Sequence, residues 1–448
     1  MTLALAFWAV AAGLAWASAA VAEISSAHAH EGVASCGGSA CHGRQVATPP
    51  DIRHDEIKIW QEPNSPAGAH SRAWRVLTEP RAQAIATRLG LGKAQDAPAC
   101  LGCHADRRGP HDPQSLFQLS DGVGCEACHG GSSQWLASHY AMGVGHADNV
   151  AKGMTPLEDP KARAAVCLDC HFGGGAPGQF VSHQIMAAGH PRIAFELDLF
   201  STLQKHYDLG ANYAGRKAVA SGVKLWAVGQ AMALDRSLTL FADARHGQEG
   251  AFPEFYFLDC HSCHRAISDD PKARPTAVAN PGRAIPVGMP PYNDENMIML
   301  SAAATVTSPK QAAAFETASH AFHTALATDR QSAVRAAGSL AAASRALANT
   351  FAGHAFSRQE TLAILQQVVG DAQSARYTDY TGSAQAVMAI DTLLNALVAE
   401  GHVDSGKAAT LRPDIDKAYR AVNDPNSYRP AEFRASLARI AAAVGALR

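Results

Sequence analysis

The cysteines of this chain restrict what it can fold into more than any other feature of its sequence. All ten occur in five close pairs, and histidine follows the second cysteine of every pair. Four pairs have the spacing C-x-x-C-H: Cys100 to His104, Cys125 to His129, Cys167 to His171 and Cys260 to His264. The remaining pair, Cys36 to His42, has four residues between its cysteines. This recurring unit indicates the same chemistry repeated at five places along the chain.

The pattern C-x-x-C-H is typical of covalent haem attachment. Two thiols add to the two vinyl groups of one haem, and the next residue brings an imidazole to the iron as the proximal ligand. The sequence therefore predicts five haem c groups, attached through Cys36, Cys41, Cys100, Cys103, Cys125, Cys128, Cys167, Cys170, Cys260 and Cys263. The predicted proximal ligands are His42, His104, His129, His171 and His264.

Three other interpretations of the cysteine pairs compete with haem attachment. Disulfides would suit an oxidising compartment, but they do not require a histidine after every pair. Zinc sites use two C-x-x-C pairs each, so five pairs would leave one unused. A thioredoxin-like redox centre has a single C-x-x-C. Because only haem explains the five histidines, haem attachment is the favoured interpretation.

The order of residues around these motifs resembles the cytochrome c-554 family of tetrahaem cytochromes. The matching residues are Cys36 to His42, Trp60, His70, Ala73, Leu77, Cys100 to His104, Gly122 to Gly130, Trp135, His139 and Cys167 to His171. The resemblance covers roughly residues 36–171. It implies that His70 and His139 are distal haem ligands and that the haem on His104 has no distal side-chain ligand. The longer first motif and the motif at Cys260 depart from the family pattern.

A second axial histidine suits a haem to electron transfer, whereas an open position allows small molecules to bind the iron. Besides His70 and His139, the candidate distal ligands are His183, His190 and His206. The first two of these three lie in an apolar stretch just after the fourth haem motif. A histidine in such a stretch can also be an ordinary buried core residue.

The first 22 residues are apolar and carry no charged side chain. Ala20-Val21-Ala22 before Glu23 fits the cleavage site of a secretory signal peptide, although the usual basic residue is missing. A stretch of about 20 apolar residues could instead remain as a membrane anchor. Under either alternative the rest of the chain is secreted, to the periplasm or the cell exterior. Membrane contact is expected only if this segment is not cleaved.

Alanine dominates after residue 300, where cysteine no longer occurs. We predict a mainly α-helical fold with extensive loops, in which a multihaem cytochrome c core precedes an Ala-rich helical bundle. The expected divisions are residues 23–214 for a four-haem core, 215–299 for a helix, the fifth haem and a Pro-rich linker, and 300–448 for the bundle. The bundle helices are expected at residues 310–327, 329–350, 357–374, 381–401, 406–422 and 430–447.

The formal net charge of −2 argues against a nucleic-acid partner, because no basic excess is available to neutralise phosphates. Electron transfer between redox proteins, such as other cytochromes or a periplasmic oxidoreductase, is the favoured function. One alternative is a haem enzyme that reduces a small nitrogen oxide at a five-coordinate iron. Another is an assembly protein that docks or forms oligomers through the C-terminal bundle.

Overall fold

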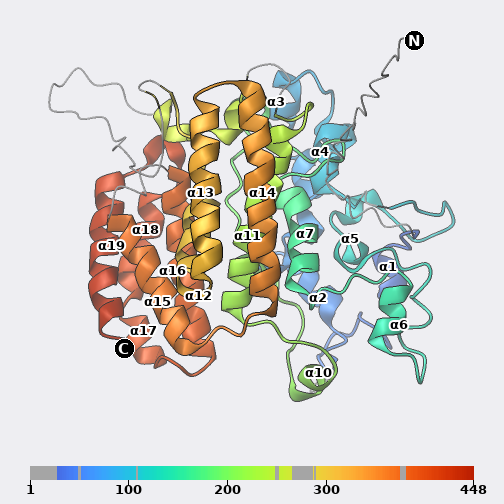
Figure 1. Cartoon of the computed structure of the whole chain (residues 1–448). Coiled ribbons are helices and arrows are strands. Elements are labelled where there is room, and N and C mark those ends of the chain that lie inside the picture. The colour runs from blue at the N-terminus through green and yellow to red at the C-terminus, as the bar shows by residue number, and fades with distance from the viewer. Residues whose placement is uncertain are drawn as a thin grey trace, which may run out of the picture.

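The computed structural model describes residues 28–48, 52–106, 109–247, 252–264, 286, 289–373 and 380–447. Within these ranges the chain is mainly helical, and its only extended pairings are two isolated β-bridges. Figure 1 shows a loop-rich part, built from the first half of the chain, beside a bundle of long helices built from the second. The prediction of a mainly α-helical fold with extensive loops is confirmed. The predicted signal peptide, residues 1–22, lies outside the described residues.

The helices of the loop-rich part are short. They are α1 Val33–Cys36, α2 Glu56–Trp60, α3 Pro80–Arg88, α4 Pro98–His104, α5 Cys125–His129, α6 His146–Ala151, α7 Pro160–His171, α8 His183–Ala187, α9 Leu197–Leu203 and α10 Ala211–Arg216. Five 3-10 turns lie among them: η1 Pro66–Gly68, η2 His70–Arg72, η3 Arg75–Thr78, η4 Ala94–Asp96 and η5 Leu119–Asp121. Proline opens α3, α4 and α7, where its missing N–H costs no hydrogen bond.

The bundle contains the long helices. They are α11 Gly222–Ala242, α12 Glu295–Thr307, α13 Pro309–Leu326, α14 Arg330–Gly353, α15 Arg358–Gln373, α16 Tyr380–Ala399, α17 Ser405–Ala409, α18 Arg412–Ala421 and α19 Pro430–Gly445. The 3-10 turns η6 Phe255–Phe257, η7 Cys260–Ser262 and η8 Pro425–Ser427 accompany them. Five of the six helices expected after residue 300 are found close to their predicted bounds. The remaining helix, expected at residues 406–422, is divided into α17 and α18, because Pro413 cannot continue a preceding helix.

One large apolar core holds the bundle together. It extends from Val223 in α11 to Leu447 and includes Trp226, Phe241 and Phe322, each of them fully buried. Helix α11 lies against both α14 and α12, so it belongs to the bundle although it precedes the fifth haem motif. The expected division between residues 299 and 300 therefore falls inside a continuous helix, α12, and inside a continuous core.

The bundle also packs directly against the helix that carries the fourth haem motif. Helix α7, in the loop-rich part, lies against α11 of the bundle (Figure 1). Arg236 of α11 donates from Nη1 to Asp169 Oδ1 at 2.6 Å and to the Gly173 carbonyl at 2.7 Å. Both charged side chains are only 8% exposed. A buried ion pair therefore joins the bundle to the Cys167–His171 motif.

Helix α16 forms a second junction between the two parts. Gln385 donates from Nε2 to the Phe195 carbonyl at 2.8 Å, and the Thr392 hydroxyl donates to Glu196 at 2.7 Å. Among the described residues, α16 is also the one helix with the length and apolarity of a membrane span, and most of it is buried inside the protein.

Candidate haem-binding sites

Three of the five Cys-Cys-His motifs are helical. Helices α4, α5 and α7 each end at the histidine of a motif. Positions i, i+3 and i+4 share one face of a helix. The two thiols and the imidazole of each motif therefore point to the same side, as attachment of one haem requires.

The first and last motifs reach the same arrangement through turns. The amide of His42 donates to the Cys36 carbonyl at 3.1 Å, and the amide of His264 donates to the Cys260 carbonyl at 2.7 Å. In the first motif the Cys41 amide donates to Gly38, which folds the longer spacer into a turn. A Cβ on Gly43 would lie 2.0 Å from the Gly37 carbonyl oxygen, so this turn requires glycine there. The two extra residues are thus absorbed while His42 stays beside Cys36.

Each predicted proximal histidine faces a different one of the five candidate distal histidines. The ring centroids are 6.3 Å apart for His42 and His139, 6.3 Å for His104 and His190, 6.3 Å for His129 and His206, 6.0 Å for His171 and His70, and 6.1 Å for His264 and His183. An imidazole nitrogen lies about 2 Å from a bound first-row metal ion, and the ring centre about 1 Å beyond it. Two imidazoles on one iron therefore have centroids about 6 Å apart. The observed spacings fit five irons, each between two histidines.

Hydrogen bonds orient five of these ten rings through Nδ1. The bonded pairs are His42 with Glu56 Oε2 at 3.0 Å, His104 with the Ala73 carbonyl at 2.8 Å, His139 with Leu136 at 2.5 Å, His190 with Pro191 at 2.8 Å and His206 with Gln204 at 3.1 Å. A metal-binding histidine commonly donates its other ring N–H to a carbonyl or a carboxylate. These contacts leave Nε2 as the atom that can bind iron.

Burial keeps several of the same imidazoles neutral. Desolvation lowers the pKa of His129 to about 3 and that of His171 to about 4. It also lowers the pKa of His70, His104, His190 and His206. His42 differs, because its hydrogen bond to Glu56 raises its pKa. A histidine must be deprotonated to bind a metal, so the lowered pKa values suit iron ligands.

Several residues outside the haem motifs also carry the family resemblance, and these residues contact one another in the fold. Trp60 donates from Nε1 to the Val123 carbonyl at 3.2 Å, and the Val123 amide donates to the His70 carbonyl at 3.0 Å. Gly122 has a φ of +75°, and a Cβ there would lie 2.5 Å from the His70 carbonyl oxygen. The backbone of the segment before the third motif is therefore fixed against the turn that carries His70.

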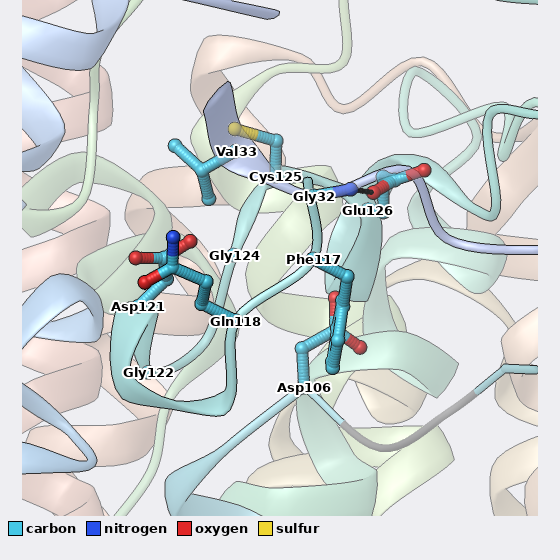
Figure 2. Close-up of a pocket in the computed structure, with 10 residues that line it drawn as sticks. All are labelled: Gly32, Val33, Asp106, Phe117, Gln118, Asp121, Gly122, Gly124, Cys125 and Glu126. Atoms are coloured by element: carbon cyan, nitrogen blue, oxygen red, sulfur yellow. Dashed lines mark hydrogen bonds between the residues drawn. The ribbon is translucent and has the colours of Figure 1, made fainter. Parts of the chain in front are cut away.

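Glu126, between the two cysteines of the third motif, joins that motif to the first one. Its carboxylate is buried and accepts from the amides of Glu31 at 2.9 Å, Gly32 at 2.7 Å and Ser132 at 2.8 Å. Figure 2 shows the bond to Gly32 beside a small pocket that reaches Cys125. The side chains of Cys36 and Cys125 are in contact. Sequence reasoning missed Glu126, because an acidic residue inside a haem motif gives no sign that it is buried.

Helix α3 holds the short segment that carries His190. Arg88 donates from Nη1 to the Ala188 carbonyl at 2.7 Å, and Arg81 donates from Nη2 to the Gly189 carbonyl at 2.9 Å. Gly189 has a φ of +116°, which side-chain-bearing residues rarely adopt. These contacts direct His190 toward His104.

Residues 35–130 match the family described as cytochrome c554 and c-prime. The similarity supports a c-type cytochrome, with covalently bound haem and a role in electron transfer. The matched segment contains the first three haem motifs and His70, whereas the fourth and fifth motifs and the other four candidate distal histidines lie beyond it. No curated protein and no solved structure matches the chain.

Proposed function

We propose that this chain is a five-haem c-type cytochrome that transfers electrons and in which two histidines bind every iron. The observation that carries the proposal is the set of five histidine pairs. In each pair the ring centroids are about as far apart as those of two imidazoles that bind one iron. The pairs are His42 with His139, His104 with His190, His129 with His206, His171 with His70, and His264 with His183. Haem iron supplies the one-electron chemistry, and the protein orients the ligands and sets their surroundings.

The position of His190 favours electron transfer over the enzymatic alternative. The family resemblance implies an open iron on His104, and reduction of a small nitrogen oxide would need such a site. Here the His190 ring lies 6.3 Å from that of His104, and Arg81 and Arg88 hold its segment in place. With His190 as the sixth ligand, the iron has no position for a substrate.

Contacts between motifs support close approach of some of the haems to one another. The side chains of Cys36 and Cys125 touch, which favours close approach of the first and third haems. Cys103 and Cys170 each place Sγ within 3.9 Å of the other motif's backbone, which favours the same for the second and fourth. Helix α8 begins with His183, and His190 follows it, so one short segment would supply ligands to the fifth and second haems.

The predicted location and partners are part of the same proposal. A secreted chain in the periplasm or outside the cell would exchange electrons with other cytochromes or with a redox enzyme. Cys41 and Cys263, in the first and fifth motifs, are both exposed. Their exposure favours these two motifs as the places where such partners approach a haem.

The number of haems tests this function directly. We expect the purified holoprotein to carry five haems per chain, counted by intact mass and by the pyridine haemochrome absorbance. The double variant Cys260→Ser with Cys263→Ser should carry four, and so should Cys36→Ser with Cys41→Ser. A wild-type chain with four haems or fewer would contradict the proposal.

A further inference from the structure

A buried ion pair that the axial ligands do not explain lies against the attachment site of the fifth haem. Arg192 Nη1 lies 4.0 Å from Cys260 Sγ and donates to the Tyr256 carbonyl at 3.0 Å. Its Nη2 lies 3.7 Å from Glu295 Oε1. The Arg192 side chain is 10% exposed and that of Glu295 is 8% exposed. Both charges therefore act on the Cys260 motif through protein rather than through water.

Two carboxylates also lie beside this motif within the described residues. Asp259 is buried and accepts from the amides of His261 and Ser262. Glu254 accepts from the amides of His183 and Tyr256. Arg192 is thus the cation that offsets these carboxylates at Cys260 within the described part of the chain.

Arg192 also links three parts of the molecule. It follows His190, the proposed distal ligand of the second haem, by two residues. Its guanidinium carbon lies 4.8 Å from the centre of the Tyr256 ring, in the turn just before Cys260. Glu295 begins α12 of the bundle. The pair therefore has a fixed position relative to the second haem, the fifth haem and the bundle.

We propose that the Arg192–Glu295 pair sets the reduction potential of the fifth haem, with Arg192 raising it and Glu295 lowering it. This inference rests on the proposed attachment of a haem at Cys260 and Cys263. Reduction adds one electron to the iron, so a nearby positive charge stabilises the ferrous form and a nearby negative charge opposes it. Burial strengthens both effects because the surrounding dielectric constant is low. Arg192 is a positioning and tuning residue here, since the iron ligands are His264 and His183.

A potentiometric titration of the holoprotein, followed in the visible spectrum, tests the proposal. The redox transition of the fifth haem is the one missing from the double variant Cys260→Ser with Cys263→Ser. Arg192→Met should shift this transition to a lower potential, and Glu295→Gln should shift it to a higher one. Arg192→Lys keeps the charge and should restore most of the wild-type value. Arg345→Met removes an exposed arginine of α14 and should leave the transition unchanged.

Opposite shifts separate an electrostatic role from a structural one, because simple loosening of the site would move both variants the same way. Shifts of the same sign, or no shift in either variant, would overturn the proposal. If Arg192→Met fails to fold, the upward shift in Glu295→Gln and the wild-type value in Arg192→Lys decide the question. Absence of haem from the Cys260 peptide in the wild-type digest would instead refute the five-haem function itself.

Discussion

Replacement of His190 by alanine is expected to convert one of the five ferric haems from low-spin to high-spin and to let that haem bind nitric oxide. The physical reason is the single imidazole whose ring lies 6.3 Å from that of His104. Its loss leaves the iron with one protein ligand and an open position. Electron paramagnetic resonance of the oxidised protein measures the high-spin signal, and this signal should disappear when nitric oxide is added, because a ferric nitrosyl has no unpaired electron.

The matched control is His320→Ala, which removes an exposed imidazole of α13. This control should keep all five haems low-spin. Both variants should carry five haems by mass, since neither changes a cysteine. A His190→Ala spectrum identical to that of the wild type would show that another group binds the iron on His104.

Replacement of Arg236 by methionine is expected to lower the free energy of unfolding by about 3–5 kcal/mol, because it removes one partner of a buried ion pair. Arg236 is the partner of Asp169, inside the fourth haem motif, and it also donates to the Gly173 carbonyl. The change therefore removes the ion pair that joins α11 to α7. Chemical denaturation of the holoprotein, followed by far-ultraviolet circular dichroism, measures the loss.

Arg345→Met is the control for this prediction. Arg345 pairs with Asp235 from an exposed position, and such surface pairs contribute only about 0–1 kcal/mol. A loss in Arg236→Met no larger than that in the control would mean that the bundle does not depend on this junction.

The helices after residue 300 could be predicted because the region is rich in alanine and several of the helices have clear start or stop signals. At α15, for example, Glu360 accepts from the amide of Ser357, and the Glu360 amide donates back to the Ser357 hydroxyl, as the local sequence suggests. Helix α12 gave no such signal. Residues 295–304 are buried on every side, so the helix shows no alternation of apolar and polar positions. The change in composition at residue 300, where alanine begins to dominate and cysteine no longer occurs, therefore predicts a bundle that begins too late.

The haem motifs could be recognised in the sequence because their cysteines and histidine are close neighbours, and the family resemblance added His70 and His139 as candidate distal ligands. Which histidine lies opposite which could not be predicted, since the paired residues are 77 to 101 positions apart in the sequence and come together only in the folded chain. The buried charged residues could not be predicted from the sequence for the same reason. Glu126, Arg192 and Arg236 look like surface residues in the sequence, and their roles depend on partners from distant segments.

Low-temperature electron paramagnetic resonance of the oxidised wild-type holoprotein, with and without nitric oxide, tests the central claim most directly. Five irons with two histidines each predict a purely low-spin ferric spectrum that nitric oxide leaves unchanged. A high-spin signal that disappears as a nitrosyl forms would contradict this account. It would show that at least one iron is open and would favour an enzyme that acts on small nitrogen oxides.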